Sequence, residues 1–339
     1  MSKIVTIEND KFIVKLFSLG AILNSFYVKS HDVDIVLGYN ESDEYLKEGN
    51  AQMGKTIGRC ANRIGNAEFT LNGKTYKLAR NNGPNCLHSG VVSFGNVEWT
   101  LIKQEKSKAV FEYYSKNMES GFPGNVKVTT TYELCDCELK ITYSAISDED
   151  TIFNITNHSY FNLDKHKKNI LSHKLKIDST KVNLNDENGM ASENVIDTNN
   201  TPFDFNDFKY ISDNISDDGA ELNTYCKNLL QNTGNNVSKQ LIDNLDTNYL
   251  YENTDYKTLC ILKNEIMKLE VKSDLPCVQI YTGKNLNVDG RDGHYSAYAG
   301  IAIEPQFCPN AINYKKFIKP VIKANEYISH TISYKVIDI

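Results

Sequence analysis

Apolar and polar residues alternate with a period of two along much of this chain. In the segment 126–134, apolar or aromatic side chains occupy most even positions and polar side chains lie between them. Leu139, Ile141 and Tyr143 continue the same period. Such alternation is typical of antiparallel strands that place one face on a core and the other in solvent.

A tight turn is encoded between two short strand-like runs, 69–71 and 74–76. They are separated by Asn72-Gly73, and this pair tolerates the positive φ values that a type I′ turn requires. The segment therefore predicts a β-hairpin. The 20 tyrosines and 14 phenylalanines suit pleated sheet surfaces.

Helical periodicity is scarce, with a short turn predicted at 41–46 and a longer segment at 221–245. We therefore expect an all-β chain, a large antiparallel β-sandwich with two sheets packed face to face. Strand patterning lapses at about 211–239, where Asn, Asp and Ser dominate, and resumes near Tyr249. We expect a surface insertion there, within a single domain that spans 1–339.

Charge and composition exclude several classes of protein. The chain has 339 residues, 40% of them hydrophobic and 24% charged, which is ordinary globular composition. The formal net charge is −6, without a long run of Lys and Arg, so we expect no nucleic-acid partner. The first ten residues have no apolar core of signal-peptide length, and no stretch is apolar enough to span a bilayer. We expect a cytoplasmic protein with no membrane partner.

The eight cysteines show no framework spacing, so free thiols are expected. Cys135 and Cys137 would share one face of a strand. A zinc site needs a second pair of ligands, however, and no matching Cys or His spacing follows. We predict no metal site.

Polar residues that suit proton transfer gather in three separated segments: 58–63 with 87–90 close behind, 156–162 and 301–306. Together they supply two histidines, a carboxylate and an arginine that follows an asparagine. These residue types can move protons and can read hydroxyl groups, so chemistry on a polyol is the first expectation.

Glu304 is the candidate general base. It shares a predicted strand face with Gly300 and Ala302, so the carboxylate would look across a surface kept open by small residues. We expect Pro305 to end regular strand pairing just after it, at the mouth of a cleft. The alternative is an ordinary solvent-facing glutamate.

Two histidines and two arginines remain open from the residues alone. His158 lies in an aromatic-rich strand with many polar neighbours, and His88 lies between Gly83 and Gly90, where the backbone can bend toward a ligand. Either histidine could instead be structural. Arg63 can present a fork of donors to hydroxyl groups, and Arg59 is its rival or a structural ion-pair partner.

The order and the amino-acid sequences of these segments resemble those of the aldose 1-epimerases, the galactose mutarotases. The strings that carry the resemblance are Gly58-Arg59-Cys60-Ala61-Asn62-Arg63-Ile64-Gly65, Asn157-His158-Ser159-Tyr160-Phe161-Asn162-Leu163, Val278-Gln279-Ile280-Tyr281-Thr282-Gly283 and Ile303-Glu304-Pro305-Gln306. The resemblance extends from about residue 4 to 336. It implies a β-supersandwich that interconverts the α and β anomers of free hexoses such as D-galactose and D-glucose, without cofactor or metal.

The resemblance also implies roles for individual residues. It makes Glu304 the catalytic base and His158 the catalytic acid. The sugar-binding groups would be Arg63, Asn62, His88, Asp246 and Gln279. The string around Asp246 departs from the family pattern, because Thr247 stands where the family usually has His, and Asp243 is the alternative. Pro305 likewise stands where the family often has Thr.

The implied mechanism requires His158 to start protonated and Glu304 to start ionised, so activity should fall at both pH extremes. A sugar-phosphate 1-epimerase, a non-catalytic carbohydrate-binding module and a glycosidase are the rival functions. The expected partner is a small-molecule aldose, and the expected assembly is a monomer or homodimer.

Overall fold

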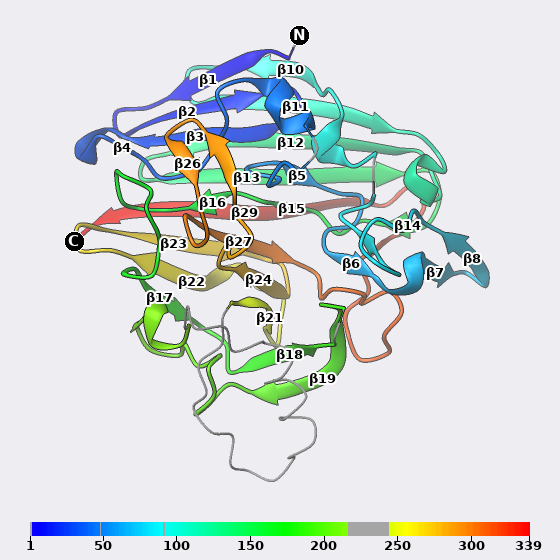
Figure 1. The fold of residues 1–339 in the computed structure, drawn as a ribbon. Coiled ribbons are helices and arrows are strands. Elements are labelled where there is room, and N and C mark those ends of the chain that lie inside the picture. Colours follow the sequence, from blue (N-terminus) through cyan, green and yellow to red (C-terminus); the bar gives the residue numbers. More distant parts are fainter. Residues whose placement is uncertain (1, 48, 91, 187, 216–243) are drawn as a thin grey trace.

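A nine-stranded antiparallel sheet forms one layer of the protein (Figure 1). The computed structural model describes residues 2–47, 49–90, 92–186, 188–215 and 244–339. In order across the sheet, the strands are β10 (Thr100–Gln104), β11 (Lys108–Ser115), β12 (Val126–Cys135), β13 (Glu138–Ser147), β29 (Tyr327–Asp338), β23 (Met267–Ser273), β22 (Lys257–Lys263), β17 (Lys174–Ile177) and β20 (Lys209–Tyr210).

A six-stranded and a four-stranded sheet provide the facing layer. The six-stranded sheet has the order β16 (Tyr160–Phe161), β27 (Ile301–Gln306), β24 (Cys277–Tyr281), β21 (Asp246–Leu250), β18 (Lys181–Asn185) and β19 (Ala191–Asp197). The four-stranded sheet, at the top of Figure 1, consists of β1 (Ile4–Glu8), β2 (Phe12–Phe17), β3 (Ile22–Val28) and β4 (Val33–Asp34).

The core lies between these layers because each strand buries alternate residues. In β12 every second side chain from Val126 to Leu134 is buried, as the alternation predicts. In β27, Ile301 and Ile303 join the main apolar cluster, so the residues between them face the opposite side of the sheet. That opposite side carries Glu304.

The all-β prediction is confirmed. Within the described residues the helical segments are all 3₁₀ turns of three to five residues, and none is long and apolar enough to cross a membrane. The turn predicted at 41–46 is η2 (Ser42–Leu46). The main apolar cluster draws residues from Val5 through to Val336. This shared cluster favours a single domain, which stays a prediction.

The predicted hairpin is confirmed in β7 (Glu68–Leu71) and β8 (Lys74–Lys77), which project at the right of Figure 1. Asn72 and Gly73 have φ values of 50° and 76°, as a type I′ turn demands. The expectation for Cys135 and Cys137 was wrong. Cys135 ends β12 and Cys137 lies in the following turn, because Asp136 takes a positive φ and reverses the chain.

Pro305 does not end strand pairing, which corrects another expectation. It lies opposite Val278, and the next pair, Gln306 with Cys277, continues the ladder between β27 and β24. β16 pairs only with the start of β27, so at Pro305 only one side of the strand carries a ladder. A proline is tolerated in such an edge-like position.

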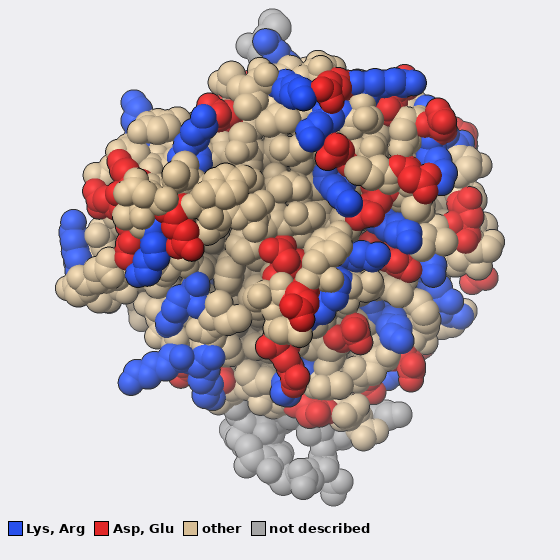
Figure 2. Space-filling view, turned by 180° about the vertical axis from the view of Figure 1, so that it is seen from behind, with Lys and Arg blue, Asp and Glu red and all other residues tan. Residues whose placement is uncertain are grey.

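Most of the predicted insertion at 211–239 lies outside the described residues. The same is true of most of the predicted helix at 221–245 and of Asp243. The described start of the insertion is not wholly on the surface: Ile211 and Ile215 are buried. Lys and Arg side chains are interspersed with Asp and Glu side chains on the face seen in Figure 2, which also has a broad uncharged area.

Candidate functional site

The floor of the candidate site is set by strand register. Gln279 on β24 lies directly opposite Glu304 on β27 on one side and Asn248 on β21 on the other. Direct partners in an antiparallel ladder point to the same face, so these three side chains form a row. Asp246 points to that face too, because it lies two residues before Asn248 on β21.

Glu304 lies deep in the protein beside His158. The carboxylate Oε1 is 3.7 Å from His158 Nε2, and the two residues are 2% and 5% exposed. Burial raises the pKa of Glu304 to about 8, and the charge of Asp246 acts in the same direction. Arg63 opposes this shift only partly.

The main chain of His158 is held by a neighbouring segment. Its N–H donates to the Lys55 carbonyl at 3.0 Å, and its carbonyl accepts from the Gly54 N–H at 2.9 Å. The ring lies against Tyr160 and His88, with centroid distances of 5.1 and 5.4 Å. Burial lowers the pKa of His158 to about 4, and the charge of Lys55 adds to the effect.

Two strained loop residues bring His88 into the site. Asn62 and His88 both have positive φ, at 59° and 51°, and they flank the short pairing of β6 (Arg63–Ile64) with β9 (Cys86–Leu87). The Asn62 N–H donates to His88 Nδ1 at 3.2 Å. The proton of neutral His88 is therefore on Nε2, where it can serve as a hydrogen-bond donor. Burial lowers the pKa of His88 well below its usual range.

Arg63 connects this loop to the strand floor. Its Nη1 is 4.0 Å from Asp246 Oδ2, and its Nε donates to Asn82 Oδ1 at 2.8 Å. Gln279 Nε2 donates to Asp246 Oδ1 at 2.6 Å. The Asp246 carboxylate is thus held between an arginine and an amide.

Arg59 points elsewhere. Its guanidinium donates to Ser115 Oγ and to the carbonyls of Lys116, Phe122 and Pro123. These contacts join the segment around residue 59 to the loop after β11. Its donors are used within the protein, whereas Arg63 faces the candidate site.

A cleft of about 360 Å³ opens above the two histidines, within the size range of small-molecule sites. Its polar lining is mostly amide and includes Asn50, Asn81, Asn96, Asn285 and Asn287. Among the described residues that line it there is no Lys or Arg.

Sequence reasoning missed two aromatic walls of this cleft. The rings of Tyr160 and Tyr281 meet edge to face, with centroids 6.0 Å apart, and both line the cleft beside His158. Both tyrosines lie in strings that carried the family resemblance. Their position in those strings was the available signal.

Several buried polar atoms of the site have no hydrogen-bond partner within the described part of the chain. They include Glu304 Oε2, Gln279 Oε1 and His158 Nδ1. A buried polar atom without a partner costs about 1–3 kcal/mol. Such atoms are suited to a ligand that brings hydroxyl groups.

The protonation of the pair differs from the sequence-based expectation. With the pKa of Glu304 at about 8 and that of His158 at about 4, the free protein at neutral pH carries one proton on the pair, and burial favours its position on Glu304. The sequence argument had placed this proton on His158. Burial of both groups reverses the order because the low dielectric penalises each charged form.

Comparison with known proteins adds an independent line of evidence. The sequence model of the aldose 1-epimerase family matches residues 3–335. The chain belongs to the aldose 1-epimerase family. It is 33% identical to the galactose mutarotase of Sus scrofa over 335 residues, which are 96% of this chain and 91% of that protein. It is 30% identical to the aldose 1-epimerase of Escherichia coli (strain K12), over 94% of this chain and 90% of that protein.

A solved structure extends the comparison to the fold. The GalM/aldose epimerase homologue from C. elegans superposes with a TM-score of 0.87 at 27% identity, and the match covers the whole of both chains. The predicted galactose mutarotase-like sandwich is thereby confirmed. As a member of this family the protein is an isomerase.

All seven predicted site residues lie in one connected group. His88 contacts Asn62 and His158, His158 lies beside Glu304, and Arg63, Asp246 and Gln279 complete the group through the contacts above. Asp246 is the aspartate on this face of β21, and Asp243 lies outside the described residues.

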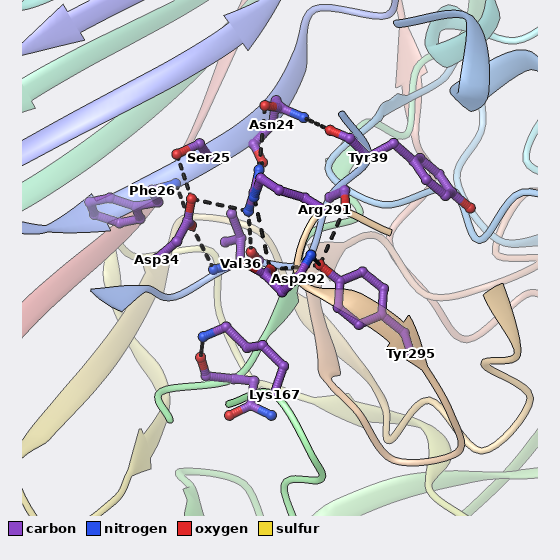
Figure 3. Close-up of polar contacts among 12 residues, drawn as sticks. Asn24, Ser25, Phe26, Asp34, Val36, Tyr39, Lys167, Arg291, Asp292 and Tyr295 are labelled. Carbon is purple, nitrogen blue, oxygen red and sulfur yellow. Dashed lines mark hydrogen bonds and ion pairs between the residues drawn. The ribbon is translucent and has the colours of Figure 1, made fainter. Parts of the chain in front are cut away.

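A second buried polar cluster lies outside the cleft (Figure 3). Arg291, between β25 (Val288–Gly290) and β26 (Gly293–Tyr295), places Nη2 3.0 Å from Asp34 Oδ2 and donates to the carbonyls of Asn24 and Val36. Burial acts to lower the pKa of Arg291, yet that pKa is raised because Asp34 and Asp292 lie beside it. These contacts attach the β25–β26 hairpin to the N-terminal sheet.

Lys167 lies close to this cluster in Figure 3. It is 4% exposed, and its Nζ donates to the carbonyls of Asn162 and Asp164, both at 2.7 Å. Burial lowers the pKa of Lys167 to about 8.

Proposed function

We propose that this protein interconverts the α and β anomers of free aldoses, with hexoses such as D-galactose and D-glucose as substrates. The observation that carries the proposal is the buried pair of Glu304 and His158, 3.7 Å apart, with His158 in the wall of a cleft whose described lining contains no Lys or Arg. Family membership supports the reaction class, since galactose mutarotase and aldose 1-epimerase are the names of its relatives.

In the proposed reaction, Glu304 removes the proton from the anomeric hydroxyl while His158 protonates the ring oxygen. The C1–O5 bond breaks and the anomeric oxygen becomes an aldehyde oxygen. After rotation about C1–C2, O5 attacks the other face of the aldehyde. His158 then takes back the O5 proton and Glu304 returns a proton to O1, so the pair ends as it began.

One proton on the pair suffices for this cycle. It is on His158 before ring opening and on Glu304 in the open-chain state. Burial favours the second arrangement, so the free protein resembles the open-chain stage of the cycle. A bound hydroxyl between the two groups can carry the proton from Glu304 to His158 before the ring opens.

The remaining site residues are proposed to bind the sugar. Neutral His88 offers Nε2–H, and Arg63 and Asn62 offer further donors at the same wall. Asp246 and Gln279 would accept from sugar hydroxyls on the strand floor. The unpaired Gln279 Oε1 supports this role.

The first experiment follows the optical rotation of freshly dissolved α-D-galactose and α-D-glucose with the purified protein. The wild type should speed relaxation to the anomeric equilibrium, and a Glu304→Gln variant should not. If neither protein accelerates relaxation, free aldoses are not the substrates. Glucose 6-phosphate is then tested.

The rival functions have separate tests. A sugar-phosphate 1-epimerase would need a basic pocket. Arg63 in the proposed sugar site faces the carboxylate of Asp246, and the described lining of the cleft contains no Lys or Arg, so we expect glucose 6-phosphate to be the poorer substrate. A glycosidase would need two carboxylates free to flank the bond, whereas Asp246 is held by Arg63 and Gln279. We expect no cleavage of a nitrophenyl glycoside.

The seven cysteines of the described residues are unpaired, which favours a reducing compartment. A cytoplasmic location and a monomeric or homodimeric assembly stay predictions. Gel filtration of the purified protein measures the second.

A further inference from the structure

Lys55 is a buried cation beside the cleft that the proposed reaction does not use. It is fully buried, and its Nζ donates to Asn50 Oδ1 at 3.0 Å and to Asn96 Oδ1 at 2.7 Å. Among the described residues no carboxylate lies within 4.0 Å of its ammonium. Buried lysines usually have such a partner. In Lys55 two neutral side-chain amides take the place of the carboxylate, and this arrangement requires an explanation.

The two amides that hold the ammonium are parts of the cleft wall. Asn50 precedes Lys55 in a loop, and Asn96 ends the 3₁₀ turn η4 (Phe94–Asn96), which comes from another part of the chain. Both residues line the cleft above the histidines. The ammonium therefore links two separate wall segments from behind.

The lysine stem also fits closely against the second wall segment. A Cβ added to Gly95 would lie 2.9 Å from Lys55 Cβ and Cδ, closer than such atoms approach. A glycine at position 95 thus leaves room for the stem. This packing leaves the ammonium little freedom to move.

The main chain of the same residue holds the candidate acid. The Lys55 carbonyl accepts from the His158 N–H, and the next two residues form β5 (Thr56–Ile57), which pairs with β15 (Thr156–Asn157). One residue thus contacts His158 through its backbone and two wall amides through its side chain.

We propose that Lys55 is a positioning residue for the sugar site, whose ammonium holds Asn50 and Asn96 in place on the cleft wall while its backbone holds His158. This inference rests on the proposed function. Lys55 touches the sugar only through these neighbours, so it is not a catalytic residue.

The positive charge of Lys55 also acts on the histidines. The groups that face His158 are Glu304 from β27, His88 from the turn after β9, Tyr160 from β16 and Lys55 itself. The charge of Lys55 contributes to the lowered pKa of both His88 and His158. Its loss should make His158 easier to protonate, so the acid limb of the activity profile should move to higher pH.

The test compares two variants with a matched control. Lys55→Met keeps the stem and removes the charge and the donors. Asn96→Asp keeps an acceptor for the ammonium but neutralises its charge. Lys167→Met is the control, because Lys167 is another buried lysine with its pKa lowered to about 8 and does not line the cleft.

For Lys55→Met we expect KM for galactose to rise on the order of 10-fold, with a smaller change in kcat, and the acid limb to move to higher pH. For Asn96→Asp we expect the same movement of the limb, because the added carboxylate offsets the charge of Lys55. Lys167→Met should leave KM and the limb unchanged.

The proposal is overturned if Lys55→Met leaves both KM and the acid limb as in wild type, or if Lys167→Met alters them equally. Should Lys55→Met fail to fold, an unmoved limb in Asn96→Asp overturns the electrostatic part. An NMR titration of the His158 ring measures the effect of Lys55 on the pKa of His158 directly. It therefore tests the electrostatic part even if the wild type proves inactive on aldoses. Inactivity of the wild type would count against the proposed function alone.

Discussion

The two buried polar clusters of this protein differ in how completely their charged groups are paired. Around Arg291 the guanidinium has carboxylates and carbonyls within reach, and Asp34 also accepts from Ser25 Oγ and the Phe26 N–H. In the other cluster Glu304 Oε2 has no hydrogen-bond partner among the described residues, and the charge of Asp246 raises the pKa of Glu304 further. One cluster is saturated and the other is not.

The difference separates a structural role from a functional one. A saturated cluster fixes the β25–β26 hairpin and leaves nothing for a ligand to bind. An unsaturated cluster costs folding free energy, and that cost is offset when a substrate supplies the missing partners. The perturbed pKa values and unpaired polar atoms of Glu304 and His158 therefore indicate that the cleft is the functional site.

The largest expected effect is on catalysis. Glu304→Gln keeps the shape of the side chain but removes the base, so kcat for galactose mutarotation should fall by roughly 10²–10⁴-fold. Polarimetry measures this loss, and circular dichroism checks the fold. Glu133→Gln, a change on the solvent side of β12, is the control and should keep full activity. A Glu304→Gln enzyme within tenfold of wild type would remove Glu304 from the mechanism.

The next effect is on stability and belongs to the other cluster. Arg291→Met leaves Asp34 without its cation, which should lower the free energy of unfolding by about 3 kcal/mol. The kcat per folded molecule should change by less than about threefold, since the catalytic pair is untouched. Urea denaturation and polarimetry measure the two quantities.

The matched control is Lys323→Met, which breaks the ion pair of an exposed lysine with Asp150. Its expected cost is below about 1 kcal/mol. Equal losses of unfolding free energy in the two variants would mean that burial does not strengthen the contribution of the Arg291 cluster to stability.

A third prediction concerns the stability cost of Glu304. Its folded pKa, about 8, lies above the ordinary value of 4.5, so the folded protein binds the extra proton between these values. Stability from this group is present below about pH 4.5 and is lost as pH rises toward 8. Glu304→Gln lacks this loss, so its free energy of unfolding relative to wild type should increase by a few kcal/mol between pH 5 and 9.

Urea denaturation at a series of pH values measures this difference. Lys323→Met again serves as a control, because its difference from wild type should stay constant over the same range. A constant difference for Glu304→Gln would show that the folded pKa is not raised.

The smallest effect is the pH dependence of kcat/KM. The pair must carry one proton, so kcat/KM should be flat between about pH 4 and 8. Below this range His158 becomes protonated as well as Glu304, and kcat/KM should fall about tenfold per pH unit. Above this range Glu304 loses its proton and the pair carries none, so kcat/KM should fall with the same slope. A rate that still rises between pH 7 and 9 would contradict this assignment.

Local patterns predicted much of the fold. The alternation at 126–134 and the Asn72-Gly73 turn depend on neighbouring residues only, and both predictions hold. The reading of Cys135 and Cys137 failed because alternation alone does not mark where a strand turns. The Pro305 prediction failed because the consequence of a missing N–H depends on which side of the strand is paired.

The candidate site was predicted in part. Five of its seven residues lie in the strings that carry the family resemblance, and the structure brings them together with His88 and Asp246. Lys55 carried no signal, since neither its burial nor its amide partners can be read from one sequence. The position of the proton on the catalytic pair was likewise hidden, because it depends on how far both groups are removed from water.

The sequence by itself determined the class of fold, the family and the residue types that could move protons on a sugar. These follow from side-chain chemistry and short-range order, which a linear pattern records. The tertiary structure alone decided which groups lie close together, how deeply they are buried and which of their hydrogen bonds are left open. Those properties set the pKa values of Glu304 and His158, because desolvation and pairing depend on atoms brought together from distant parts of the chain.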